Sequence, residues 1–171
     1  MARLFGPTAP LLAIAMSLTG VHSATSQEAS AAHDEQIASI RASECGQAPY
    51  SILLSVMDVR KAEGLVTADL HNDNPERFLA SGRKLARIRV PAVMGETLIC
   101  IPVEQPGKYA VAVYHDKDAD MKFDKTWIGL PDEPFGLTRD PKIRLSKPDV
   151  EDVVFDVQGP LTPATATLRR L

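Results

Sequence analysis

Four aspartates lie close together in the second half of the chain and are the best candidates for chemistry in the sequence. Asp116, Asp118, Asp120 and Asp124 follow His115 within ten residues. Acids at this spacing in a tight loop can converge on one hard cation, because Ca²⁺ takes six to eight oxygen ligands. Carboxylates this close repel one another, and a bound cation would relieve the repulsion and order the loop. Ca²⁺ is therefore the candidate cofactor, and the backbone carbonyl of Lys122 could add an oxygen ligand.

The spacing of these acids is not that of an EF-hand. The sixth position of the loop, normally Gly, is Met121, and the twelfth, normally Glu, is Trp127. Met121 in a left-handed conformation would cost on the order of 1 kcal/mol. A shorter calcium turn is still open, in which Asp132 or Glu133 folds back to supply a further carboxylate. The alternative interpretation is a solvated hairpin loop whose acids keep the edge of a sheet soluble.

Three residues around the acidic loop are candidate ligand-binding residues: His115, Trp127 and Phe135. His115 beside Asp116 could act as a general base, although a histidine at a strand end more often makes a structural hydrogen bond. The two aromatic side chains could stack on a sugar or clamp a peptide, or they could cap the open end of the domain. The usual hydrolase, metalloprotease and nucleotide-binding motifs are absent, so we assign no catalytic residue.

Composition limits the classes of protein to which the chain could belong. It has 171 residues, of which 44% are hydrophobic and 24% charged, as in one ordinary globular domain. There are 19 basic and 22 acidic residues, which give a formal net charge of −3. A nucleic-acid partner is not expected, because such proteins carry a basic excess. We expect a protein or carbohydrate ligand; the sequence specifies neither its identity nor the oligomeric state.

The N-terminal segment predicts export. Residues 1–26 contain no acidic residue, carry the basic Arg3 near their start, and include an apolar stretch at 11–18. This stretch is shorter than the roughly 20 residues that cross a bilayer, and it is typical of a secretory signal peptide. Residues 27–44 then form a tether or a short helix. We expect a periplasmic or secreted protein without a membrane span.

The two cysteines of the sequence are Cys45 and Cys100. In an oxidising compartment an even pair of cysteines predicts a disulfide. Closing a loop of this length would stabilise the fold by about 4 kcal/mol in the chain-entropy model.

From Tyr50 onward the sequence consists of short apolar runs with two-residue periodicity, separated by turn residues. Seven or eight such runs without long amphipathic helices predict an all-β fold, an Ig-like antiparallel two-sheet sandwich over residues 45–171. Pro102 predicts an edge strand or a strand end, because proline has no N–H for the ladder. His71, Arg87 and Arg89 alternate with apolar residues and are expected to face water. The runs cover residues 52–56, 66–70, 85–90, 97–103, 109–115, 143–145, 153–157 and 164–168.

The segment Tyr-Ala-Val-Ala-Val-Tyr-His-Asp at 109–116, the aspartate-rich turn and Ile-Gly-Leu-Pro-Asp-Glu-Pro-Phe-Gly at 128–136 together resemble the DUF2141 family, a bacterial secreted domain of unknown function. The resemblance extends more faintly over residues 52–157. Asp118 and Asp120 stand where the family usually has Asn, and Met121 where it has Gly. The resemblance implies an exported sandwich similar to transthyretin-like and carboxypeptidase-regulatory-like modules, which mostly serve as accessory or binding units.

Three hypotheses of function follow from the sequence. The favoured one is an exported, non-enzymatic binding module that uses the region 115–136, with an acidic loop ordered by Ca²⁺. The second is a small periplasmic hydrolase or lyase that uses His115 with Asp116 or Glu133. The third is a purely structural envelope protein whose acidic loop only ends a hairpin.

Overall fold

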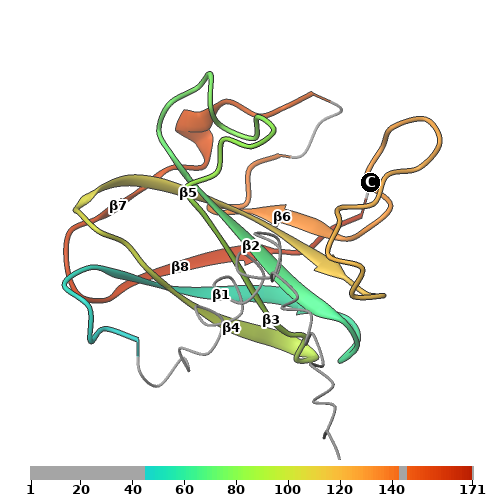
Figure 1. Cartoon of the computed structure of the whole chain (residues 1–171), viewed down its shortest axis with the longest axis horizontal. Coiled ribbons are helices and arrows are strands. Elements are labelled where there is room, and N and C mark those ends of the chain that lie inside the picture. The colour runs from blue at the N-terminus through green and yellow to red at the C-terminus, as the bar shows by residue number, and fades with distance from the viewer. Residues whose placement is uncertain (1–44, 143–145, 171) are drawn as a thin grey trace, which may run out of the picture.

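A computed structural model describes residues 45–142 and 146–170, and these form a sandwich of two β-sheets (Figure 1). Eight strands and one short 3-10 turn, η2 (Val150–Asp152), are assigned in these ranges. The predicted all-β two-sheet fold is therefore confirmed. The predicted signal peptide, the tether and the run at 143–145 lie outside the described residues. Within the described ranges, no helix has the length and apolar character needed to cross a membrane.

The first sheet has three strands: β1 (Ser51–Val59), β4 (Gly95–Pro102) and β8 (Thr162–Thr167), in the order β4-β1-β8. β4 pairs antiparallel with β1 and ends at Pro102 on an edge of the sheet, as predicted. β8 pairs with β1 in parallel, which differs from the expected all-antiparallel arrangement. A parallel pair needs a long crossover connection. Here the chain forms strands of the second sheet after β4, before it returns to the first sheet as β8.

The second sheet has five strands: β2 (Leu65–Asn72), β3 (Ala86–Pro91), β5 (Gly107–Asp116), β6 (Phe135–Leu137) and β7 (Phe155–Val157). The main path runs in the order β3-β2-β5-β6, and β7 also pairs with β5. β6 pairs with the C-terminal half of β5 and β7 with its first residues, all in antiparallel register. β5, the longest strand, therefore organises this sheet.

The core between the two sheets follows from the two-residue period of the strands, because alternate side chains point to opposite faces. Alternate residues in the central parts of β1, β2 and β5 are apolar and buried, and β3 and β4 add further aliphatic side chains. Removing these side chains from water is the main favourable term in folding. The central members are Ile52, Leu54, Val56, Val66, Ala68, Leu70, Ile88, Ile99, Ile101, Val111 and Val113.

The outer face of the second sheet is also covered. Phe78, in the connection between β2 and β3, is fully buried in a second apolar cluster with Ala110, Leu137, Val150 and Val153. Figure 1 shows this connection, in green, beside the orange-red η2 turn. His71 is consequently buried, so its predicted exposure to water is wrong, whereas Arg87 and Arg89 are half-buried and only partly exposed. The period of two predicted the face correctly, but it contains no information about what covers that face.

The predicted disulfide is confirmed. Cys45 and Cys100 are bridged, with their Cα atoms 5.5 Å apart. The bond attaches the segment that precedes β1 to the edge strand β4.

Gly64, in the turn between β1 and β2, allows this turn to pack against the start of the acidic loop. Its φ is +69°, and a Cβ at this position would lie 2.1 Å from the carbonyl oxygen of Asp116 and 2.6 Å from that of Lys117. Glycine tolerates both the left-handed conformation and the close approach. The turn and the acidic loop are therefore packed backbone against backbone.

We expect Gly64→Ala to destabilise the protein by clearly more than Gly82→Ala. Gly82 has nearly the same φ, +67°, but open space where a Cβ would be. Gly82→Ala should therefore cost only the left-handed conformation, about 1 kcal/mol, whereas Gly64→Ala adds a backbone collision. Urea unfolding of both variants checks this. Equal losses of unfolding free energy would contradict the packing described here.

Candidate functional site

The acidic loop begins at the end of β5, and the structure gathers its first three aspartates. One carboxylate oxygen each from Asp116, Asp118 and Asp120 lies within 4.8 Å of the other two. Asp116 is fully buried, while Asp118 and Asp120 are exposed. The arrangement offers a cation three carboxylate ligands, one fixed at the strand end and two on the loop.

Asp116 holds the loop in its tight conformation. Its two carboxylate oxygens accept hydrogen bonds from the backbone N–H groups of Asp120, at 3.2 Å, and Met121, at 2.9 Å. Met121 has a φ of +68°, the left-handed conformation considered for this position. Burial is the main cause that raises the pKa of Asp116, and these backbone hydrogen bonds oppose it. The carboxylate is thus both a structural anchor and a charge at the base of the loop.

Lys122 contacts the same loop through its own donors. Its backbone N–H donates to Asp120 at 2.8 Å, and its Nζ donates to the other oxygen of that carboxylate at 3.0 Å. These bonds lower the pKa of Asp120, the backbone bond being the larger cause. The ammonium group now occupies one side of Asp120, so an incoming cation would compete with it.

Glu133 folds back onto the acidic loop, which is one of the two possibilities that the sequence left open for Asp132 and Glu133. Its Oε2 accepts a hydrogen bond from the backbone N–H of Asp124 at 3.3 Å, and the residue is only 8% exposed. The pKa of Glu133 is raised to about 7, mainly by burial; the negative charges of Asp116 and Asp124 contribute to the rise, and the backbone hydrogen bond from Asp124 opposes it. Glu133 and Asp124 therefore lie beside the three converging aspartates and add to a partly buried cluster of negative charge.

The three candidate ligand-binding residues have different surroundings. His115 is 1% exposed, and its Nε2 lies 2.8 Å from the carbonyl oxygen of Glu63. Trp127 is 96% exposed, on the connection between β5 and β6. Phe135 is half-buried and packs edge-on against Phe123, with ring centroids 6.2 Å apart. The structure does not gather these three side chains into one site.

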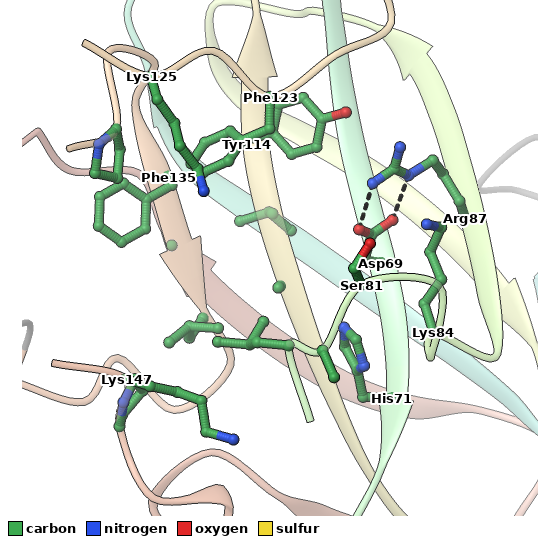
Figure 2. A pocket seen from close by; sticks show the side chains of 18 of the residues that line it. Asp69, His71, Ser81, Lys84, Arg87, Tyr114, Phe123, Lys125, Phe135 and Lys147 are labelled. Atoms are coloured by element: carbon green, nitrogen blue, oxygen red, sulfur yellow. Dashed lines mark hydrogen bonds and ion pairs between the residues drawn. The ribbon is translucent and has the colours of Figure 1, made fainter. Parts of the chain in front are cut away.

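A cleft of about 720 Å³ lies over the outer face of the second sheet, and the sequence analysis missed it (Figure 2). Asp69 and His71 of β2 line it together with Tyr114 of β5 and Phe135 of β6. Its described walls come from residues 79–84, 123–131, 141 and 146–148, on three separate connections. The sequence signal for it is the polar alternation at Asp69, His71 and Arg87, a pattern that is equally typical of a water-facing side.

The cleft contains a charge pair and a buried histidine. Asp69 and Arg87 occupy paired positions of β2 and β3, and two hydrogen bonds of 2.5 and 2.6 Å join their side chains. His71 is 4% exposed, and burial lowers its pKa. The carboxylate of Asp69 opposes this effect, whereas the positive charges of Lys84 and Arg87 add to it. Burial therefore favours the uncharged form of the His71 imidazole.

Comparison with known proteins gives one match. The model of a family described as "Uncharacterized protein conserved in bacteria (DUF2141)" matches residues 54–164, which cover most of the sandwich. No curated protein and no solved structure shows significant similarity to the chain.

We expect Glu133→Gln to stabilise the metal-free protein at pH 8, by about 1–3 kcal/mol, and to have little effect at pH 4.5. Between pH 4.5, the ordinary pKa of a glutamate, and about pH 7, the folded state keeps a proton on Glu133 that the unfolded state has already lost. Stability is therefore lost as the pH rises through this window, and the neutral amide avoids that loss. Chemical unfolding of the wild type and the variant in excess chelator, at pH 8 and at pH 4.5, measures this difference in unfolding free energy.

Glu76→Gln, at an exposed position on the β2–β3 connection, is the matched control and should change stability little at either pH. A Glu133→Gln variant that is less stable than the wild type at pH 8 would contradict the assigned cost of the buried charge.

Proposed function

This chain belongs to the DUF2141 family, and we propose that it is an exported, non-enzymatic binding module whose acidic loop is ordered by Ca²⁺. The observation that carries the proposal is the convergence of Asp116, Asp118 and Asp120 at the end of β5. The family description assigns no activity, so the proposal rests on the geometry of the loop.

The oxygen atoms around the loop suit calcium. Asp116, Asp118 and Asp120 would be ligands, and the Lys122 carbonyl could supply another oxygen. Glu133 and Asp124 would add negative charge beside them, and Glu133 could turn a carboxylate oxygen toward the ion. Ca²⁺ accepts such flexible sets of six to eight oxygens, whereas Mg²⁺ demands near-ideal octahedral geometry.

The buried charge of Glu133 favours this proposal over a purely structural loop. A carboxylate whose pKa burial raises to about 7 destabilises the fold wherever it is ionised. A hairpin loop that only ended a strand would gain nothing from burying this group next to Asp116. A bound divalent cation would compensate the charge and turn the cost into binding energy.

The position of His115 favours a binding module over a hydrolase or lyase. Its ring is buried, and Nε2 lies within hydrogen-bonding distance of the Glu63 carbonyl rather than facing a cleft. A general base must reach the proton that it abstracts from a substrate.

The disulfide supports the proposed location. Bridged cysteines are typical of secreted and periplasmic proteins and rare in the cytosol. The bond between Cys45 and Cys100 therefore agrees with the signal peptide predicted for residues 1–26.

We expect millimolar Ca²⁺ to raise the melting temperature of the protein above its value in chelator, and Mg²⁺ to raise it less. At about 100 times the dissociation constant, a ligand that binds only the folded state adds about 2.7 kcal/mol of stability. The double variant Asp118→Asn/Asp120→Asn should lose most of the calcium effect. Asp73→Asn, at an exposed position outside the loop, should keep it.

Calorimetric melting of the three proteins in calcium, magnesium and chelator makes the comparison. A melting temperature that calcium leaves unchanged in the wild type would remove the metal from the proposal and favour the structural alternative.

A further inference from the structure

The cleft over the second sheet carries a charge opposite to that of the whole protein. Its described lining includes Lys84, Arg87, Lys125 and Lys147 but only one carboxylate, that of Asp69. These five groups give the cleft a formal charge of +3, in a chain whose net charge is −3. A concave surface with an excess of one sign attracts ligands of the other sign. The cleft therefore favours an anion.

The positive charge of the lysines is not compensated within the described structure. Asp69 is the only carboxylate in the described lining, and it already accepts two hydrogen bonds from Arg87. Lys84 and Lys125 have no ion-pair partner among the described residues. Lys147 donates to the carbonyl oxygens of residues 75 and 78, at 2.9 and 3.1 Å, and these bonds hold its charge in place without neutralising it.

Figure 2 shows how these groups are placed around the cleft. Lys125 and Lys147 extend into it from one side, and His71 faces it from the other, below the Asp69–Arg87 pair. His71 is more than nine-tenths buried, and its Nδ1 is buried without a hydrogen-bond partner. Buried polar atoms are nearly always paired, and an unpaired one costs about 1–3 kcal/mol. The base of the cleft therefore lacks a polar group that a ligand could supply.

One wall of the cleft is aromatic. The ring of Phe123 packs against Tyr114, with centroids 5.1 Å apart, and against Phe135 at 6.2 Å. Leu130 and Pro131 continue this wall. In Figure 2 the three rings gather on one side of the cleft, away from His71. Small-molecule sites combine such an apolar lining with a few polar groups, in volumes of roughly 300–1,000 Å³.

From these features we propose that the cleft binds a small amphiphilic anion, with a carboxylate or phosphate head group and an apolar body. The head group lies among Lys84, Lys125, Lys147 and His71, and the body packs against the aromatic wall. This site is separate from the acidic loop, although both involve the connection between β5 and β6.

The proposal is tested by calorimetric titration of the whole protein with decanoate, decyl phosphate and decanol, which share one apolar chain. We expect at least one of the two anions to bind at least tenfold more tightly than the alcohol, and the stronger anion identifies the preferred head group. The difference should shrink as the salt concentration rises, because salt screens the lysine charges. The titrations are carried out both in chelator and in calcium, so that anion binding by the cleft is measured with and without a cation on the acidic loop. Anions that bind no more tightly than decanol would overturn the proposal.

Charge-removing variants test the same site from the side of the protein. The double variant Lys84→Gln/Lys125→Gln should weaken binding of the preferred anion by about tenfold, or about 1.4 kcal/mol, and leave decanol binding unchanged. Lys108→Gln, at an exposed position of β5 outside the cleft, is the control and should bind like the wild type. Circular dichroism establishes that each variant is folded. A folded double variant with unchanged affinity for the anion would overturn the proposal.

Discussion

The structure depends on one constraint: both faces of the second sheet are covered by other parts of the chain. The inner face packs against the first sheet through aliphatic side chains, which the two-residue period supplies. The outer face carries Asp69, His71, Arg87 and Tyr114, and it lies beneath the connections that surround the cleft. Removal from water favours pairing of polar groups. Asp69 and Arg87 pair across neighbouring strands, and the Arg87 guanidinium also lies over the Tyr114 ring. The covering connections therefore produce both the packing and the chemistry of this face.

β5 joins the two features discussed as sites. Tyr114 and Asp116 are two residues apart and so point to the same face of the strand. Tyr114 contributes to the aromatic wall, whereas Asp116 anchors the acidic loop through its bonds to the backbone of Asp120 and Met121. The chain that leaves this loop returns through Phe123 and Lys125 to the cleft. One connection of fewer than twenty residues therefore supplies parts of both.

The sequence predicted those features that depend on local pattern. Alternation predicted all the strands except the short β6, Pro102 predicted the edge of the first sheet, and the even pair of cysteines predicted the disulfide. The spacing of Asp116, Asp118 and Asp120 predicted their convergence, because these residues share one short loop. The parallel pairing of β1 with β8 was not predictable, since it depends on how the chain crosses between sheets.

The cleft escaped prediction for a related reason. His71 and Arg87 have an ordinary water-facing pattern in the sequence, and only the tertiary packing of distant connections buries them. Nothing local indicates that residues 123–131 and Lys147 face the same space as β2.

The bridge between Cys45 and Cys100 has a mechanical consequence. It closes a covalent ring of residues 45–100, which contains β1, β2, β3 and most of β4. When the two ends of the domain are pulled apart, tension passes from Cys45 through the sulfur atoms directly into the end of β4. The backbone of residues 45–100 is bypassed by this covalent path, so stretching can lengthen only the part of the chain that follows Cys100.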